Sequence, residues 1–157
     1  MQILVHTMHY TGGRLAPLPL PVRNYRDADY PVYRPMYNSS FAPMRRALGL
    51  SPVNCCPGRE EMRKKANQVF MVEVAGLLIG SVAIYGKEID DLIVAKEFRR
   101  KGYGQGLLRF AVARMQQEGR SPISLHVADW NRGAILLYQK NGFAIVHTET
   151  ISPSEGT

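Results

Sequence analysis

Residues 98–108 read FRRKGYGQGLL and contain the most informative pattern of the chain. Gly102, Gly104 and Gly106 alternate directly after an apolar, strand-like stretch and directly before an amphipathic one. Such a turn exposes backbone N–H groups at the start of a helix, where the helix dipole also favours an anion. Glycine suits these positions because a side chain would block a phosphate and because positive φ angles are expected there. With the basic run at residues 99–101 at its mouth, the turn is predicted to hold a pyrophosphate.

Two better-known phosphate-binding patterns do not match this turn. A P-loop requires a Lys followed by Ser or Thr after its last glycine, whereas two leucines follow the glycines here. The dinucleotide fingerprint requires the spacing G-x-G-x-x-G, whereas these glycines alternate. A glycine-rich turn without any ligand remains as the alternative interpretation.

Outward from this turn, the hydrophobic pattern predicts a mixed α/β fold. Apolar side chains recur at helical spacing between residues 107 and 115, whereas the stretches before the turn read as strands joined by tight turns. A strand, a helix and a second strand in succession indicate a parallel crossover. Strands are predicted at residues 68–74, 77–85, 88–95, 121–127 and 143–150, and helices at residues 103–117 and 131–141.

The first part of the chain is rich in loops. Asp27 or Asp29 is predicted to cap one short helix, and residues 38–40 are predicted to cap a second one that ends at Leu50. Prolines at positions 31, 35 and 43 argue against a single long helix. Residues 59–67 have the composition of a polar, exposed helix. The strand-like residues 3–9 precede a segment rich in Pro and Gly, and they are therefore predicted to be an appendage.

Composition limits the classes of function. The chain has 157 residues, of which 45% are hydrophobic, which fits one folded domain and excludes a mainly disordered chain. No apolar run is long enough for a membrane span, and the N-terminal residues lack the basic region of a signal peptide, so a cytoplasmic location without a membrane partner is expected. The net charge of +7 attracts anions, but the basic residues form no recognised nucleic-acid-binding motif. Nucleic acid is therefore not expected as a partner.

The two cysteines, Cys55 and Cys56, are adjacent in the sequence. A disulfide between neighbours is strained, and two cysteines without nearby histidines make a poor zinc site. We therefore expect a reducing compartment and no metal.

A second informative stretch reads SLHVADWNRGAILLYQKNGF over residues 124–143. Asn131 and Tyr138 are seven residues apart, which places them on nearly the same face of a helix, with the small Ala134 between them. Taken alone, such an Asn is more often a helix cap and such a Tyr more often a core residue.

Together, the two stretches resemble the GNAT superfamily of acyl-CoA-dependent N-acyltransferases. The family element Arg-x-x-Gly-x-Gly matches at Arg99, Gly102 and Gly104, and the second family motif matches from Asn131 through LYQKNGF at residues 137–143. The resemblance implies a mixed, mostly antiparallel central sheet of about six to seven strands flanked by about four helices. It implies an N-acetyltransferase domain at residues 21–152, preceded by an N-terminal extension with an extra strand at residues 1–20 and followed by a flexible tail at residues 153–157.

The resemblance also implies roles for individual residues. Tyr138 would protonate the departing thiolate, Asn131 would hydrogen-bond the pantetheine arm of coenzyme A beside Ala134, and an amide near Val94 would stabilise the oxyanion. The remaining cofactor contacts would come from the pantetheine-pairing backbone of Leu92, Ile93 and Val94 and from the pyrophosphate loop, which is formed by Arg99, Arg100, Lys101, Gly102, Tyr103, Gly104 and Gln105.

The reaction also needs a base, because an alkyl amine is protonated at neutral pH. His126 is the first candidate, because Leu125 and Val127 point to the opposite face of its strand and histidine titrates near neutrality. Asp90 and Asp91 compete with it, and strand parity predicts that one of the two faces the cleft. Proton removal by a chain of waters, without a single basic side chain, is a further alternative. His6, His9 and His147 lie outside the motifs and are interpreted as surface or appendage residues.

The acceptor is the least defined part. Tyr25, Tyr30, Tyr33, Tyr37 and Phe41 could wall an acceptor pocket, although a core role is the favoured interpretation. The neighbouring Arg23, Arg26 and Arg34 hint at an anionic group on the acceptor.

The expected activity is transfer of the acetyl group of acetyl-CoA to a primary amine of a small molecule, a protein N-terminus or a lysine. The sequence offers no plausible nucleophile for an acyl-enzyme, so direct attack in a ternary complex is predicted. A non-catalytic acyl-CoA-binding module is the alternative, and a homodimer is left open.

Overall fold

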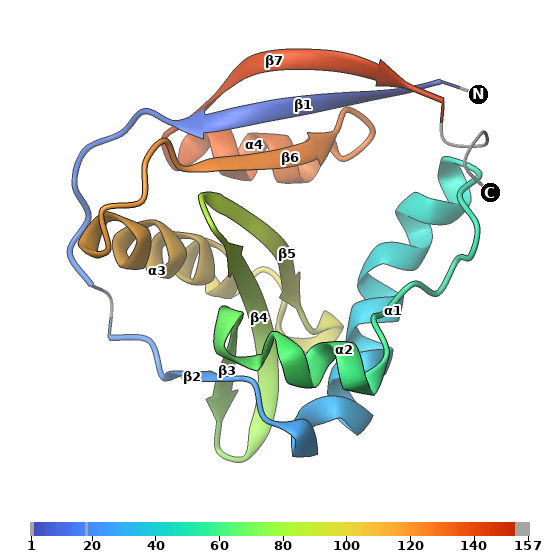
Figure 1. The fold of residues 1–157 in the computed structure, drawn as a ribbon, viewed down its shortest axis with the longest axis vertical. Coiled ribbons are helices and arrows are strands. Elements are labelled where there is room, and N and C mark those ends of the chain that lie inside the picture. The colour runs from blue at the N-terminus through green and yellow to red at the C-terminus, as the bar shows by residue number, and fades with distance from the viewer. Residues whose placement is uncertain (1, 18, 153–157) are drawn as a thin grey trace.

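The computed structural model describes residues 2–17 and 19–152. Within them, strands β1–β7 form one sheet in the order β2-β3-β4-β5-β6-β1-β7, and four α-helices flank it (Figure 1). The predicted fold class is therefore confirmed, while the predicted tail at residues 153–157 lies outside the described residues. The strands are β1 Ile3–Tyr10, β2 Val22–Asn24, β3 Val69–Val74, β4 Leu77–Tyr85, β5 Glu88–Val94, β6 Ser124–Ala128 and β7 Phe143–Ile151, and the helices are α1 Tyr30–Ala47, α2 Arg59–Lys64, α3 Tyr103–Gln117 and α4 Arg132–Lys140.

The helices cover the two faces of the sheet in pairs. Helix α3 has the bounds that its apolar spacing predicted, and it packs with α4 in one hydrophobic cluster through Leu107, Leu108 and Ile135. Helices α1 and α2 bury Tyr33, Tyr37 and Met62 in a second cluster on the other face. No helix in the described part of the chain has the length and apolarity needed to cross a bilayer.

The sheet opens between its two halves. Strands β5 and β6 run parallel, as the predicted crossover requires, and within the described residues they pair at a single register, Glu88 opposite Ser124. Figure 1 shows β6, β1 and β7 crossing the top of the view at a steep angle to β3, β4 and β5. Beyond Glu88, the edge of β5 that faces β6 is therefore free of strand pairing.

The prediction that residues 3–9 are an appendage is wrong. Strand β1 lies between β6 and β7 and pairs antiparallel with both. His6, which was also interpreted as a surface or appendage residue, is 8% exposed, and its ring nitrogens lie 2.8 Å from Asp129 Oδ1 and 2.8 Å from Thr148 Oγ1. The partner strands follow more than half of the chain later, so the local sequence carries no signal of this pairing.

The prediction that prolines divide the region after residue 30 is also wrong. Helix α1 runs unbroken through Pro35 and Pro43, and the predicted caps at residues 38–40 lie inside it. A proline removes one helical hydrogen bond, but most helix stability in proteins comes from packing. Burial of Tyr33 and Met36 against the sheet supplies that packing here. Strand β2 was not predicted; it pairs with β3.

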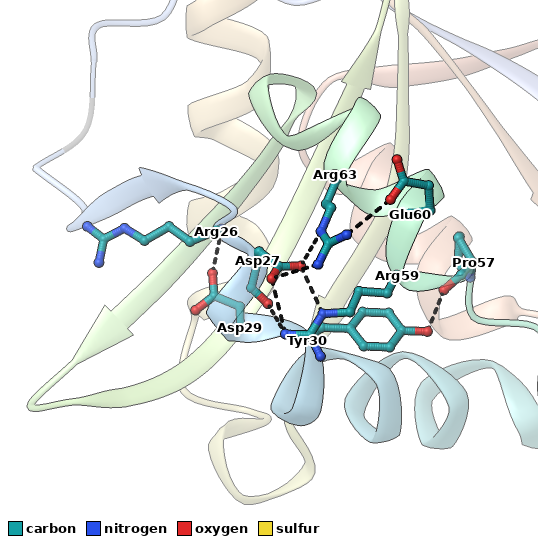
Figure 2. A network of polar contacts seen from close by, with 8 residues as sticks. All are labelled: Arg26, Asp27, Asp29, Tyr30, Pro57, Arg59, Glu60 and Arg63. Atoms are coloured by element: carbon teal, nitrogen blue, oxygen red, sulfur yellow. Dashed lines mark hydrogen bonds and ion pairs between the residues drawn. The ribbon is translucent and has the colours of Figure 1, made fainter.

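Helix α2 is held to the segment before α1 by a polar network. Both Arg59 Nε and Arg63 Nε donate to Asp27 Oδ1 at 2.9 Å, and Tyr30 Oη donates to the Pro57 carbonyl at 2.9 Å (Figure 2). The predicted helix at residues 59–67 is exposed on this side. Its opposite side is buried through Met62, which is 0% exposed.

Candidate functional site

A cavity of about 550 Å³ opens where β5 and β6 diverge. It extends between the two faces of the sheet, from the N-terminal part of α3 and from α4 to Phe41 and Met44 of α1. Most of the predicted site residues line this cavity, namely Asp91, Leu92, Val94, Arg99, Gly104, His126, Asn131, Ala134 and Tyr138.

The glycine-rich turn forms the N-terminal end of α3. Gly102 has a φ of +87° and caps the helix, whereas Gly104 and Gly106 are helical, so a positive φ is needed at one of the three glycines. The Gly106 amide donates to the Gly102 carbonyl at 2.9 Å, which leaves the preceding amides of the first turn without helical partners. A Cβ on Gly104 would lie 3.7 Å from Val94 Cγ2 and 3.8 Å from Leu137 Cδ2. Glycine at this position therefore keeps space open between β5 and α4.

Helix α4 contributes the opposite wall. Asn131 caps it, and its Oδ1 accepts a hydrogen bond of 3.2 Å from the Ala134 amide. Two turns further on, Tyr138 is partly buried against the first hydrophobic cluster and lines the cavity. Burial, reinforced by the negative charge of Asp90, raises the pKa of Tyr138 to about 12. Its phenol therefore stays protonated at neutral pH and is able to donate a proton.

His126 enters the cavity from β6. Leu125 and Val127 are buried, while His126 is exposed on the other face of the strand, as the alternation predicted. His126 Nδ1 lies 2.9 Å from Glu88 Oε1. An ionised carboxylate accepts but does not donate, so this contact places a proton on Nδ1 and leaves Nε2 as the ring nitrogen with a free lone pair. Glu88 was missed because it is distant in sequence and approaches His126 through the pairing of β5 with β6.

Asp90 and Asp91 lie at a β-bulge in β5. In the pairing with β4, Ser81 faces Ile93 and Ala83 faces Asp90, so β5 has one extra residue. Asp91 has a φ of +47°, its amide donates to Asp90 Oδ1 at 2.8 Å, and Tyr37 Oη donates to Asp91 Oδ1 at 3.2 Å. Both carboxylates line the cavity, and the prediction from strand parity is wrong because the bulge interrupts the alternation.

The environment of Asp91 makes its ionisation less favourable than that of an ordinary carboxyl group. Burial is the largest cause and the negative charge of Asp90 the next, and together they raise the pKa of Asp91 to about 6. The charge of Lys65 and the hydrogen bond from Tyr37 act in the opposite direction.

Several predicted site residues lie outside the cavity lining. The Ile93 side chain is buried in the second cluster, and residues 100–103 and Gln105 belong to the turn and the first helical residues beside the cavity. The second cluster buries Tyr25, Tyr33 and Tyr37, in agreement with the core role that was the favoured interpretation. In contrast, Phe41 lines the cavity together with Met44, which was not predicted as a site residue.

The arginine side chains near the start of α1 do not support an anionic acceptor. Arg23 forms ion pairs with Asp29 at 2.8 Å and with Glu73 at 2.7 Å. Arg26 and Arg34 also lie outside the residues that line the cavity. The cavity lining therefore gives no support to an anionic group on the acceptor, which stays a prediction.

Comparison with known proteins agrees with this geometry. The model of the Acetyltransferase (GNAT) family matches residues 28–143. Over 60 residues the chain is 45% identical to GCN5-related N-acetyltransferase 6, chloroplastic, of Arabidopsis thaliana, covering 38% of this chain and 21% of that protein. Over 93 residues it is 30% identical to an uncharacterized N-acetyltransferase of Methanocaldococcus jannaschii, covering 52% of this chain and 41% of that protein. The chain thus matches less than half the length of either curated relative.

The fold is also found in solved structures. The PaiA N-acetyltransferase of Thermoplasma acidophilum, solved in complex with coenzyme A, superposes with a TM-score of 0.69 at 18% identity. The match covers 84% of this chain and 94% of that one. At this level of identity, the likeness concerns the fold.

Proposed function

The chain belongs to the GNAT family of acetyltransferases, and from that membership we propose that it transfers the acetyl group of acetyl-CoA to a primary amine. The observation that carries the proposal is the cavity between β5 and β6, which brings together Tyr138, His126 and the N-terminal end of α3. These are the groups that an acid, a base and an anion cradle require.

The residues present fit coenzyme A. The free amides at Tyr103, Gly104 and Gln105 and the exposed basic run at residues 99–101 would hold its pyrophosphate. The unpaired edge of β5 from Leu92 to Val94 offers backbone groups to the pantetheine arm, and the space beside Gly104 leaves room for it. Bound acetyl-CoA would supply the acetyl group as a thioester.

We assign the proton transfers to two side chains that line the cavity. His126 accepts the proton of the attacking ammonium through Nε2, while Glu88 holds the ring through Nδ1. The neutral nitrogen then forms the new N–C bond, and as the C–S bond breaks it loses its second proton. Tyr138 donates its proton to the departing sulfur and is reprotonated by this second proton through solvent, so the products are an amide, a free thiol and a protonated His126. Asp91 is the competing base, since its raised pKa also suits proton transfer near neutrality.

Thermal unfolding with acetyl-CoA, CoA, ATP and NADH tests the binding half of the proposal. A ligand at about 100 times its Kd adds ~2.7 kcal/mol, or roughly 5–10 °C for a chain of this size. We expect this shift with the two CoA species, followed by release of free thiol when an amine is added. A shift without thiol release from any amine would favour the non-catalytic acyl-CoA-binding module, and the lack of a shift would overturn the proposal.

A further inference from the structure

The end of the cavity that is formed by α1 and the β5 bulge carries an excess of negative charge. Asp90 and Asp91 are neighbours there, and Glu88 lies directly behind His126. Of the described residues that line the cavity, the basic ones are His126 and Arg99, and Arg99 Nε donates to the Val94 carbonyl, toward the α3 end. Outside the cavity lining, Arg23 is held in ion pairs with Asp29 and Glu73, and Lys65, whose charge acts on Asp91, is shared with Glu61 at 3.6 Å.

A single ammonium does not balance this charge during the reaction. The attacking nitrogen must lose its proton before it forms a bond, and at that moment it no longer compensates a carboxylate. Two adjacent carboxylates in a partly buried site would then have Lys65, which is shared with Glu61 and lies outside the cavity lining, as their compensating charge, and this is unfavourable. A second ammonium on the same acceptor stays protonated throughout and removes this cost.

The walls next to the two carboxylates suit a hydrocarbon chain. Phe41 and Met44 of α1 line the cavity, and the ring of Phe41 lies 4.7 Å from that of Tyr37, the residue that donates to Asp91. Apolar side chains favour methylene groups, and aromatic faces also attract ammonium groups. The site therefore presents an apolar segment that adjoins a pair of negative charges.

From this juxtaposition we propose that the acceptor is a small linear diamine or polyamine, whose distal ammonium binds Asp90 and Asp91 while its other nitrogen is acetylated. The inference rests on the proposed acetyl transfer and specifies its substrate class. An amino acid, with a carboxylate in place of the distal ammonium, would be repelled from the same position.

Three amines with the same carbon chain test the charge of the distal group. Hexylamine, hexanediamine and aminohexanoate end in a methyl, an ammonium and a carboxylate, respectively. A charge-assisted hydrogen bond stabilises by about 1.5–3 kcal/mol, so kcat/KM for hexanediamine should exceed that for hexylamine by at least about tenfold, with aminohexanoate lowest. Equal kcat/KM values for hexylamine and hexanediamine, or a preference for aminohexanoate, would overturn the inference.

Two conservative variants locate the recognition. Asp90→Asn and Asp91→Asn keep a side-chain oxygen that accepts the present hydrogen bonds, and Asn tolerates the positive φ of Asp91. Each should lower the hexanediamine-to-hexylamine ratio of kcat/KM toward one. As a control, Glu118→Gln removes a charge from an exposed side chain at the end of α3, outside the cavity lining, and the ratio should stay at its wild-type value. A wild-type ratio in both Asp variants, with unchanged unfolding temperatures, would overturn the assignment.

Further measurements distinguish a failure of this inference from a failure of the proposed function on which it rests. A short peptide with two adjacent lysines offers the same pair of ammonium groups from a protein, and a higher kcat/KM for it than for every linear diamine from propane to hexane would overturn the small-molecule assignment. Acetyl transfer to monoamines without a preference for dications would leave the proposed function intact and this inference wrong. Failure to bind acetyl-CoA would remove the proposed function itself.

Discussion

His126 Nδ1 and Glu88 Oε1 lie 2.9 Å apart and join β6 to β5 beside the register at which these parallel strands meet. The contact therefore lies at the point where the sheet begins to open. A carboxylate at Nδ1 fixes the orientation and the tautomer of the ring, so that Nε2 is free to accept a proton, which is what a general base needs from a supporting residue. Two predictions follow from the geometry of this pair, one for each partner.

Replacing His126 by Ala should lower kcat by about 10²–10⁴-fold, the range for loss of a general base, while the affinity for acetyl-CoA stays near its wild-type value. Glu88→Gln should lower kcat less, because the amide oxygen still accepts the hydrogen bond from Nδ1, although the amide can also donate and so no longer fixes the tautomer of the ring. Steady-state kinetics over a range of pH measure both. If Asp91→Asn abolishes turnover while His126→Ala has little effect, the base is Asp91.

Tyr138→Phe should lower kcat by about 10²-fold or more and leave CoA binding almost unchanged, because the substitution removes the proton donor and keeps the ring. Since the pKa of Tyr138 is raised to about 12, its phenol should not limit the rate of the wild-type enzyme below about pH 11. Stopped-time thiol release and a CoA titration separate the two effects. A large loss of CoA affinity with turnover retained would show that Tyr138 binds the cofactor and does not act as the acid.

The glycines of the α3 turn should respond differently to substitution. Gly102→Ala places a side chain at φ +87°, which costs roughly 1–2 kcal/mol of stability, whereas Gly104 is helical and gains helix propensity from an added side chain. Gly104→Val should raise the KM for acetyl-CoA, because its side chain fills the space between Val94 and Leu137. Thermal unfolding and acetyl-CoA titration of both variants measure the contrast. An unchanged KM in Gly104→Val would show that this space is not used.

We expect the negative charge of Asp29 to stabilise the folded protein. Asp29 is 7% exposed, and it accepts hydrogen bonds from Arg23 Nη1 at 2.8 Å and Nη2 at 2.9 Å and from the Arg26 amide at 2.8 Å. Burial opposes its ionisation, but these donors hold the pKa of Asp29 below its usual range. Its native state therefore binds fewer protons than the unfolded state, so this stabilisation is present above about pH 4 and is lost as the pH falls.

We expect Asp29→Asn to lower the free energy of unfolding by about 3 kcal/mol at neutral pH, because it breaks a buried ion pair. The exposed Asp27, whose partners are shown in Figure 2, is the matched control, and Asp27→Asn should have a clearly smaller effect. Urea denaturation at neutral and acidic pH tests both. The wild type and Asp29→Asn should converge in stability at low pH, and a constant difference would contradict an effect that depends on the charge of Asp29.

Local sequence signals predicted the part of the fold where neighbours in sequence are also neighbours in space. The strand hairpins from β3 to β5 and helix α3 follow from alternation, tight turns and apolar spacing, and the glycine turn marks one end of the site. The position of β1 did not follow, because its pairing with β6 and β7 depends on residues more than half of the chain away. The contact of Glu88 with His126 was not predicted for the same reason, because it depends on the pairing of the parallel strands β5 and β6.

The bulge and helix α1 show a different limit, in which tertiary structure overrides a local rule. Strand parity predicts that Asp90 and Asp91 point to opposite faces, and one inserted residue changes this. Proline propensity predicts a helix break, and burial of one face of α1 outweighs it.

This explanation of α1 predicts that Pro43→Ala stabilises the protein. Pro43 is exposed and lies near the end of the helix, where it leaves the Ser39 carbonyl without its helical donor. Inside a helix, alanine is more stable than proline by about 3 kcal/mol. Alanine also gives the unfolded chain more conformational freedom, which lowers this gain in stability by about 1 kcal/mol. A net gain of about 1–2 kcal/mol should appear in urea denaturation.

Pro31 provides the control for this prediction. It is also exposed but lies in the first turn of α1, where a missing N–H has no helical partner to lose. Pro31→Ala should therefore change stability by less than about 0.5 kcal/mol, in the range of ordinary surface substitutions. If both variants gain the same stability, the gain comes from the helix propensity of alanine and not from a restored hydrogen bond to the Ser39 carbonyl. If Pro43→Ala destabilises the protein, the packing of α1 depends on the helix shape that its prolines impose. In that case, the explanation that packing holds α1 together in spite of its prolines is wrong.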